Sequence, residues 1–399
     1  MKNLLRFTLL FSFLISFLLF QGSNLWAQQD STSDAIAQIE RGISDADDEL
    51  AKLSIEELLE QLNVPGVSVA VIKDFSILWS KGYGTADVVA GTAVDTETLF
   101  QAASISKPVN AMAILKAAED GHFSIDQDIN SVITGWQIPE SQFTQNEFVS
   151  ARMLASHTSG LGDGFGFPGY DPSEPLPTLQ QIFDGEEPSN VGVVRVVRPP
   201  MTAYHYSGGG VTILQQALID TYNQPYAELM QELVLNPVGM TQSTFEQPLP
   251  AELDRNAARA HSFRGEASGP KWHVYPEQAA AGLWTTSTDL AKFAIEVQLS
   301  AQNRSNAVLN QESTKEMLSP VGVGPFAVGF SITKRGEGWY FDHGGSNFGF
   351  QAQLTAHLSK GYGYAIMTNS PPGRRLIQEL GRRIEASYFY DSNATPVRR

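Results

Sequence analysis

The order of hydrophobic periods along the chain limits its fold more than any other feature of the sequence. Near the N-terminus, residues 67–72 and 77–84 predict two strands joined by a tight turn at Lys73-Asp74. Four segments near the C-terminus alternate or run apolar with glycine-containing turns between them: 327–333, 338–342, 349–358 and 362–368. Strands at both ends with helices between them predict one antiparallel sheet built from both termini. The fold class is therefore α+β, with flanking helices and a mostly helical insertion.

Helical periodicity and capping residues place the helices. Ser54 and Glu57 have the spacing of a capping box, which predicts a helix from about Ser54 to Leu62. Ser287 or Thr288 is expected to cap another helix. The remaining helices are expected near 104–120, 149–156, 178–183, 210–222, 225–235 and 374–388.

The first 27 residues have the pattern of a secretory signal peptide. Lys2 and Arg6 form a short basic region, and an apolar run from Phe7 to Phe20 follows, shorter than a membrane span usually requires. Leu25-Trp26-Ala27 offers an imperfect cleavage site, and an uncleaved anchor is the alternative. An exported protein, periplasmic or secreted from a bacterium, is expected.

The composition excludes cysteine chemistry and disfavours two classes of binding partner. The 399-residue chain contains no cysteine, which excludes a lipoprotein anchor, a structural disulfide and a cysteine nucleophile. Its formal net charge of −16 disfavours binding to nucleic acid and to anionic membranes. No stable membrane span is expected once the signal is removed, and the sequence gives no oligomeric state.

We expect a single domain over residues 28–391. Its sheet lobe is predicted over about 54–100 and 281–391, and its helical lobe over about 101–280. Residues 392–399 are expected to form a flexible tail, and disorder is expected from Asp391 onward.

One stretch carries the strongest chemical signal. Ser104 and Lys107 are three residues apart where a short strand runs into an apolar helix, so both fall on one helix face. The lysine can take the serine's proton if burial lowers its proton affinity, which is the S-x-x-K arrangement of serine nucleophiles. Alone, the pattern is weak, and a serine N-cap with an exposed lysine would ordinarily be the favoured interpretation.

Three other stretches make the catalytic interpretation the stronger one. They are Tyr204-His205-Tyr206-Ser207-Gly208, Phe341-Asp342-His343-Gly344-Gly345-Ser346, and Leu154-Ala155-Ser156-His157-Thr158-Ser159-Gly160. In this order and spacing, the sequence resembles the superfamily of serine β-lactamases and penicillin-binding proteins. The similar branch is that of class C β-lactamases, D-Ala-D-Ala carboxypeptidases and related serine esterases. The resemblance spans nearly the whole mature chain and implies their fold.

The resemblance also implies roles for individual residues. Ser104 is the nucleophile, Lys107 its proton partner, and Tyr206 matches the tyrosine of the Y-x-N motif. Whether Lys107 or Tyr206 is the general base stays open. His343, Gly344 and Gly345 stand in place of the K-T-G strand motif, where side chains at the two glycines would obstruct a substrate. The backbone amides of Ser104 and Ser346 are candidates for the oxyanion hole.

Two departures from the motifs bear on the substrate. Gly208 stands where the β-lactamases carry an asparagine, so no side-chain amide is available there. His343 replaces a lysine, so its charge near a substrate carboxylate would depend on pH. Both changes argue against an efficient β-lactamase.

The sequence therefore predicts an exported serine hydrolase that cleaves a small-molecule ester, amide or peptide through an acyl-Ser104 intermediate and is esterase-like. A D-Ala-D-Ala carboxypeptidase or D-aminopeptidase is the first alternative. A non-catalytic penicillin-binding or sensor module is the second. His157 and Thr158 are interpreted as residues that fix a loop. The histidines have no metal-ligand spacing, so no metal or other cofactor is expected.

Overall fold

The computed structural model describes residues 32–42, 48–163, 166–388 and 390–391. The expected signal peptide and the expected tail after Asp391 lie outside these residues. Asp391 itself is held in place, because its carboxylate accepts hydrogen bonds from Tyr340 at 2.7 Å and from Lys360 at 2.6 Å. The expectation that disorder begins at Asp391 is therefore wrong for this residue.

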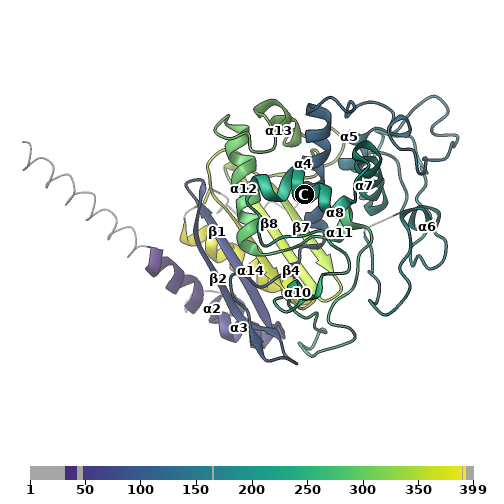
Figure 1. The fold of residues 1–399 in the computed structure, drawn as a ribbon. Helices are drawn as coiled ribbons and strands as arrows, with labels where there is room; N and C mark the ends of the chain where they lie inside the picture. Colours follow the sequence, from purple (N-terminus) through teal and green to yellow (C-terminus); the bar gives the residue numbers. More distant parts are fainter. Residues whose placement is uncertain (1–31, 43–47, 164–165, 389, 392–399) are drawn as a thin grey trace, which may run out of the picture.

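One antiparallel sheet dominates the fold, and its strands come from both ends of the chain (Figure 1). In space the strand order is β3-β2-β1-β9-β8-β7-β6. The strands are β1 (Gly66–Lys73), β2 (Ser76–Asp87), β3 (Thr92–Ala93), β6 (Ser331–Arg335), β7 (Gly338–Asn347), β8 (Phe350–His357) and β9 (Gly363–Thr368). A two-stranded sheet of β4 (Phe100–Gln101) and β5 (Trp284–Thr285) lies beside it. The contact of N-terminal β1 with C-terminal β9 confirms the predicted α+β sheet assembled from both termini.

The sequence of strand β1 does not alternate: apart from Ser68 it is apolar from Val67 to Ile72. Both of its faces are covered, because α12 (Ser287–Ala301) packs on one side of the sheet and α14 (Gly373–Ser387) on the other. Ala70 and Ile72 belong to the larger apolar core, whereas Val69 and Val71 pack with α14 and the N-terminal helices. A strand that is buried on both faces favours hydrophobic side chains on both of them, and the buried Ser68 hydroxyl is hydrogen-bonded to that of Ser287 at 2.7 Å.

The helices between the two groups of strands form the predicted insertion (Figure 1). The N-terminal helices are one over 32–41, α2 (Glu49–Lys52) and α3 (Ile55–Leu62). The remaining helical elements are η1 (Ala103–Ile105), α4 (Ser106–Glu119), η2 (Ile129–Ser131), α5 (Ala151–Ala155), α6 (Leu179–Asp184), α7 (Gly208–Tyr222), α8 (Tyr226–Met230), η3 (Gln231–Leu235), α9 (Asn236–Val238), α10 (Ala251–Asp254), α11 (Gln278–Ala281) and α13 (Gln311–Met317).

Several boundaries differ from the sequence predictions, and others agree. The capping box of Ser54 and Glu57 is present at the start of α3, as predicted. The cap of α12 is Thr286, whose hydroxyl accepts from the amide of Asp289, rather than Ser287 or Thr288. Strand β7 continues five residues beyond the predicted end, through the His343 motif to Asn347, because β8 pairs with it along that whole length.

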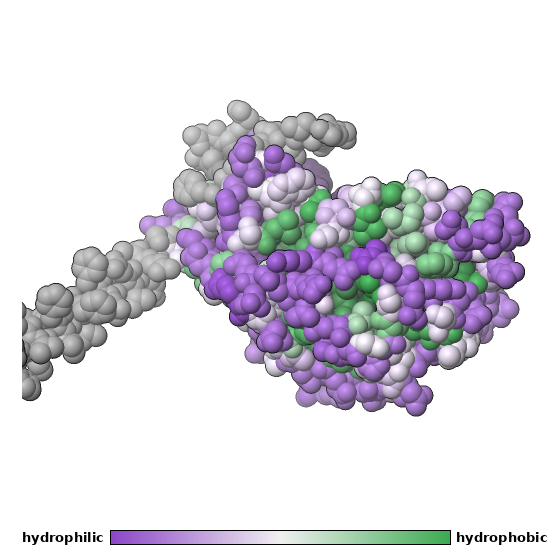
Figure 2. Space-filling view, turned by 90° about the horizontal axis from the view of Figure 1, so that it is seen from above, coloured by the Kyte–Doolittle hydropathy of each residue, from purple (hydrophilic) through white to green (hydrophobic). Residues whose placement is uncertain are grey.

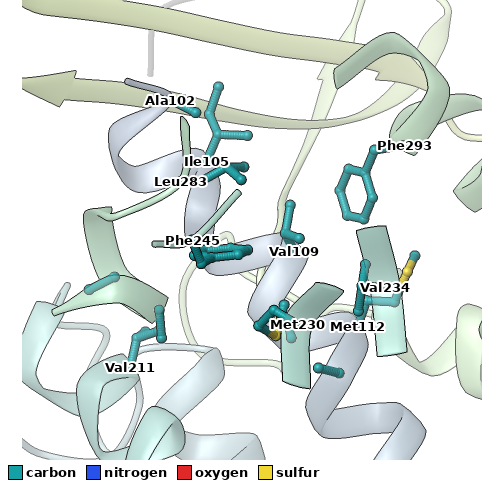
Figure 3. Packing of buried hydrophobic residues seen from close by; sticks show 14 of the residues in the cluster. Ala102, Ile105, Val109, Met112, Val211, Met230, Val234, Phe245, Leu283 and Phe293 are labelled. Atoms are coloured by element: carbon teal, nitrogen blue, oxygen red, sulfur yellow. The ribbon is translucent and has the colours of Figure 1, made fainter. Parts of the chain in front are cut away.

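Helix α4 runs through the middle of the apolar core. All its residues from Ser106 to Leu115 are buried. Figure 3 shows its side chains Val109 and Met112 among residues from other segments, including Val234 and Phe293. A helix that is buried on every face gives any ionisable side chain on it a low-dielectric environment. Lys107 lies on the first turn of this helix.

The exterior is largely hydrophilic on the face that Figure 2 shows, with smaller hydrophobic areas between the hydrophilic residues. Among the residues that the structure describes, no helix combines the length and the apolar character needed to cross a bilayer.

Candidate active site

Ser104 lies in a tight turn rather than at the cap of a regular helix. The turn η1 covers Ala103–Ile105 and leads directly into α4. Ala103 has a φ of 51°, a left-handed conformation that costs energy for a residue with a side chain. Unlike its immediate neighbours, which are buried, Ser104 is partly exposed. The strained turn thus presents the serine hydroxyl to a cavity, as the catalytic interpretation requires.

Lys107 lies one turn further along and faces Ser104. Its Nζ donates to Ser104 Oγ at 3.0 Å and to the carbonyl oxygen of Ala280 at 2.7 Å. The side chain is 2% exposed, and no carboxylate contacts it within the described residues. Burial lowers the pKa of Lys107 from its ordinary 10.5 to about 7, and the negative charge of Asp163 partly opposes this shift. The spacing prediction for this pair is therefore realised in the geometry.

Tyr206 lies on the other side of Ser104. Its hydroxyl forms a hydrogen bond with the Ser104 side chain, and its ring lies 5.0 Å from Lys107 Nζ, measured to the ring centroid. Burial raises the pKa of Tyr206 well above its usual value, and the hydrogen bond to Ser104 only partly offsets this. The phenol is therefore protonated at neutral pH.

His157 holds Tyr206 in this position. Its ring packs against the Tyr206 ring with 4.2 Å between centroids, and its Nδ1 accepts from the amide of Ser207 at 3.2 Å. His157 has a φ of 61°, a second strained residue beside the site. Phe326 packs edge-on against both His157 and Tyr206. The sequence predicts for His157 only that it fixes a loop, and it gives no signal for Phe326, because no local pattern reveals contacts between residues so far apart in the chain.

Strand β7 brings its free edge to Ser104. Strand β6 pairs with β7 only from Gly338 to Asp342, so within the described residues the segment from His343 to Asn347 has no strand on that side. A Cβ atom on Gly345 would overlap the carbonyl oxygen of Ala102. Gly345 is therefore needed because the strand packs directly on the turn that carries Ser104. This contact is a separate reason for glycine at this position, and the expectation that a side chain here would obstruct a substrate stays a prediction.

Gly344 and Ser346 point away from that contact, toward solvent. Both are exposed, and a Cβ on Gly344 would lie 3.3 Å from the flexible side-chain oxygen of Gln353. Both residues line the cavity in front of Ser104.

His343 is buried and neutral. Its Nδ1 lies 2.7 Å from the carbonyl oxygen of Gly344, so Nδ1 carries the proton and donates it. Burial, aided by the nearby Lys107, lowers the pKa of His343 to about 3. The imidazole is therefore neutral at neutral pH, and it gains a charge only in strong acid.

Gly208 begins α7 beneath an aromatic ring. A Cβ on Gly208 would lie 2.6 Å from Cε2 of Phe167, so Phe167 occupies the space that a longer side chain at this position would need. Gly208 does not line the cavity in front of Ser104. Asp163 fixes the chain nearby by accepting from Ser207 Oγ at 2.6 Å and from the amide of Gly209 at 2.7 Å.

A cavity of about 460 Å³ opens in front of these residues. It is lined by Ser104 and Tyr206 together with Tyr204, Phe326, Ser331, Asp342, His343, Gly344, Gly345, Ser346, Gln351, Ala352, Gln353, Arg374, Ile377 and Gln378. Six of the eight sequence-predicted site residues therefore share one cavity, and Lys107 reaches it through its hydrogen bond to Ser104. Among the described residues, no group of three or more histidine, aspartate or glutamate side chains is arranged to hold a metal ion.

The sheet, the helical insertion and the serine beside the β7 edge define the β-lactamase/transpeptidase fold of serine hydrolases. The sequence model of the β-lactamase family matches residues 52–387, and the chain belongs to this family. Families of this fold are generally enzymatic.

Known relatives are distant in sequence. The chain is 23% identical to Protein flp of Staphylococcus aureus strain N315 over 360 residues, covering 88% of this chain and 69% of the relative. It is 24% identical to Penicillin-binding protein 4 of Amycolatopsis lactamdurans over 346 residues, covering 82% and 87%. The structure of D-alanine carboxypeptidase AmpC from Burkholderia cenocepacia superposes with a TM-score of 0.66 at 18% identity, covering 90% of this chain and 99% of that one. At this identity the structural likeness shows the fold alone.

Proposed function

We propose that the protein is an exported serine hydrolase that cleaves esters or small amides through an acyl-Ser104 intermediate, with esters as the favoured substrates. The observation that carries this proposal is the pair of hydrogen bonds on the Ser104 hydroxyl, one from Lys107 Nζ at 3.0 Å and one with the Tyr206 phenol. Proposed export rests on the signal-like pattern of residues 1–27 alone.

The two partners have different protonation states, which suggests different roles. With a pKa of about 7, Lys107 has a free lone pair in about half of the molecules at neutral pH. Tyr206 keeps its proton under the same conditions. We therefore assign Lys107 as the base that accepts the Ser104 proton, and Tyr206 as the acid that protonates the leaving group.

The proposed reaction proceeds in two steps. Ser104 Oγ attacks the carbonyl carbon while its proton moves to Lys107, and the oxygen anion that forms is bound by the amides of Ser104 and Ser346. The carbon–oxygen or carbon–nitrogen bond then breaks, Tyr206 gives its proton to the leaving group, and the Lys107 ammonium returns a proton to Tyr206. Water next hydrolyses the ester on Ser104 and releases the acid.

Two features favour an ester substrate over a β-lactam. His343 is neutral, so the strand position that would carry a lysine offers no cation for a carboxylate. Phe167 covers Gly208, so no side-chain amide points toward the substrate from the start of α7.

A D-Ala-D-Ala carboxypeptidase or D-aminopeptidase is the second candidate. It is supported by the likeness to penicillin-binding protein 4 and to D-alanine carboxypeptidase AmpC. A penicillin-binding sensor without turnover is the candidate from another class.

One assay separates the three candidates. The mature chain is incubated with p-nitrophenyl acetate, with an acetylated D-Ala-D-Ala peptide and with benzylpenicillin, and products and intact mass are followed together. Ester turnover that is lost in Ser104→Ala supports the proposal, and release of D-alanine supports the second candidate. A stable penicilloyl adduct without turnover of any substrate would identify a sensor, and no labelling of Ser104 would overturn all three.

A further inference from the structure

The turn at the end of helix α5 contains a histidine where such turns usually contain glycine. Its left-handed residue is His157, with a φ of 61°. The amide of His157 donates to the carbonyl oxygen of Leu154 at 3.3 Å. The amide of Thr158 donates to the carbonyl oxygen of Met153 at 2.9 Å. These two hydrogen bonds form a Schellman motif, in which glycine, and less often asparagine, takes the left-handed position without strain.

His157 contacts three consecutive residues of the loop that precedes α7. Its carbonyl oxygen accepts from the amide of His205 at 2.8 Å. Its ring packs against the Tyr206 ring with 4.2 Å between centroids, and its Nδ1 accepts from the amide of Ser207 at 3.2 Å. One residue therefore fixes the backbone on both sides of Tyr206 as well as the ring of Tyr206 itself.

The loop that carries Tyr206 has no regular structure of its own. Residues 204–206 belong to no helix or strand and are only partly buried. The Tyr206 hydroxyl must nevertheless lie within hydrogen-bond distance of Ser104. A misplacement of about 1 Å can slow a reaction roughly 100-fold. Contacts with other segments must therefore set the position of the phenol, and those of His157 are the most extensive that we find.

His157 carries a second cost besides its backbone strain. Because Nδ1 accepts from Ser207, the ring proton is on Nε2, which is buried without a hydrogen-bond partner among the described residues. Burial lowers the pKa of His157 well below its usual 6.5, and the charge of Lys107 lowers it further, so Nδ1 stays an acceptor at neutral pH. A residue that only ended the helix would need neither the strain nor the unpartnered donor.

We propose that His157 is a positioning residue, which holds the Tyr206 hydroxyl where it can protonate the leaving group. This role rests on the proposed function, in which Tyr206 is the acid and Lys107 the base. The hydrogen bonds of Lys107 go to Ser104 and to the carbonyl oxygen of Ala280, so the base does not depend on His157. Loss of His157 should therefore slow the reaction only for substrates whose leaving group needs a proton.

Two variants that both suit a left-handed backbone test this role. His157→Gly removes the ring and the acceptor together. His157→Asn also removes the ring, but its side-chain oxygen is bonded to Cγ as Nδ1 is in histidine, so it can accept from the Ser207 amide. Because both residues are compatible with the Schellman motif, the end of α5 is preserved in both variants.

The assay compares ethyl acetate with p-nitrophenyl acetate, which form the same acyl-Ser104 and differ only in the leaving group. In His157→Gly, kcat/KM is expected to fall at least tenfold for ethyl acetate and less than threefold for p-nitrophenyl acetate. His157→Asn should return ethyl acetate hydrolysis to within threefold of wild type. Adding His157→Gly to Tyr206→Phe should lower ethyl acetate hydrolysis less than twofold further, because both changes remove the same contribution.

His205 provides the matched control. It directly precedes Tyr206, and its Nε2 has no hydrogen-bond partner among the residues that the structure describes. His205→Leu removes an imidazole from the same loop and should change the hydrolysis of both esters by the same factor. The positioning role is overturned if His157→Gly leaves both rates unchanged or lowers them equally, if its effect multiplies with that of Tyr206→Phe, if His157→Asn gives no recovery, or if His205→Leu shows the same dependence on the leaving group.

A measurement without turnover separates this result from failure of the proposed function. The protein is labelled with carbon-13 at the tyrosine Cζ atoms, and the NMR resonance of Tyr206 is assigned from its absence in Tyr206→Phe. Adding Ser104→Ala removes the hydrogen bond between Ser104 and Tyr206, so it should shift this resonance in the wild-type and His157→Asn backgrounds but not in His157→Gly. If this pattern appears and no ester is hydrolysed, the proposed function fails and the positioning of Tyr206 stands. If Ser104→Ala shifts the resonance equally in all three backgrounds, His157 does not position Tyr206, even when ester hydrolysis proceeds.

Discussion

The rate at which Ser104 is acylated should follow the titration of Lys107. A buried lysine with a pKa of about 7 is half neutral at pH 7, whereas a lysine at the ordinary 10.5 would be neutral in only about one molecule in 3,000. Acylation is therefore expected to rise about tenfold per pH unit below pH 7 and to level off above pH 8. His343, with a pKa of about 3, cannot produce this inflection.

The assay is the second-order rate of Ser104 labelling by a fluorophosphonate between pH 5 and pH 9, read by intact mass and corrected for reagent hydrolysis. Ser104→Ala is the unlabelled control. Asp163→Asn should move the midpoint to lower pH, because the carboxylate of Asp163 raises the pKa of Lys107 in the wild type. A flat profile, or a midpoint near pH 10, would refute the assignment of Lys107 as the base.

The lowered pKa of Lys107 also predicts that the free energy of unfolding rises with pH. One pKa unit corresponds to about 1.36 kcal/mol, so lowering the Lys107 pKa from 10.5 to about 7 reflects a cost of about 5 kcal/mol for the buried ammonium. Between pH 7 and pH 10.5, Lys107 is protonated in the unfolded chain and neutral in the folded protein. The cost is therefore complete below pH 7 and shrinks as the pH rises.

Lys107→Met removes the titrating group. The variant should be more stable than the wild type by about 5 kcal/mol at pH 6 and by about 2 kcal/mol at pH 9. The difference in their free energies of unfolding therefore falls by about 3 kcal/mol between these pH values. Urea denaturation at both pH values measures this difference. If the difference between variant and wild type does not depend on pH, the pKa of Lys107 is not lowered in the folded protein.

Three further predictions follow from other parts of the site. In Gly345→Ala, the new Cβ overlaps the Ala102 carbonyl oxygen and must displace β7. We expect kcat/KM to fall roughly 100-fold or more, the scale of loss when one oxyanion-hole donor is misplaced. Steady-state kinetics measure this fall, and a wild-type kcat/KM would contradict the prediction. Tyr206→Phe should slow hydrolysis of alkyl esters about 100-fold but that of p-nitrophenyl esters much less, because nitrophenolate leaves without a proton; equal losses for both esters would contradict the acid role. Burial raises the pKa of Glu277 from its usual 4.5 to about 8, so the stability of the wild type should fall as the pH rises between these values. Glu277→Gln should remove this fall, which thermal unfolding scans at pH 5 and pH 8 measure. The same change in Tm between the two pH values for wild type and variant would contradict the prediction.

The sequence by itself predicted most of the elements and singled out Ser104 as the candidate reacting group. Period-2 and period-3.6 patterns, the capping box at Ser54 and the positions of the glycine turns are local properties, so they predicted the two groups of strands and the helices between them. The spacing of Ser104 and Lys107 needed only the geometry of one helical turn. The order of the Tyr206 and His343 motifs then gave the family.

The tertiary structure decided the protonation states and the shape of the site, because both depend on distant segments. Lys107 has a lowered pKa since its helix is buried on every face, and His343 is neutral for the same reason. Gly345 is explained only by the close approach of β7 to the Ser104 turn. Arg374 lies some 270 positions from Ser104 in the sequence. Only the packing of α14 against the sheet brings its charge to the cavity in front of Ser104, and no local pattern carries that information.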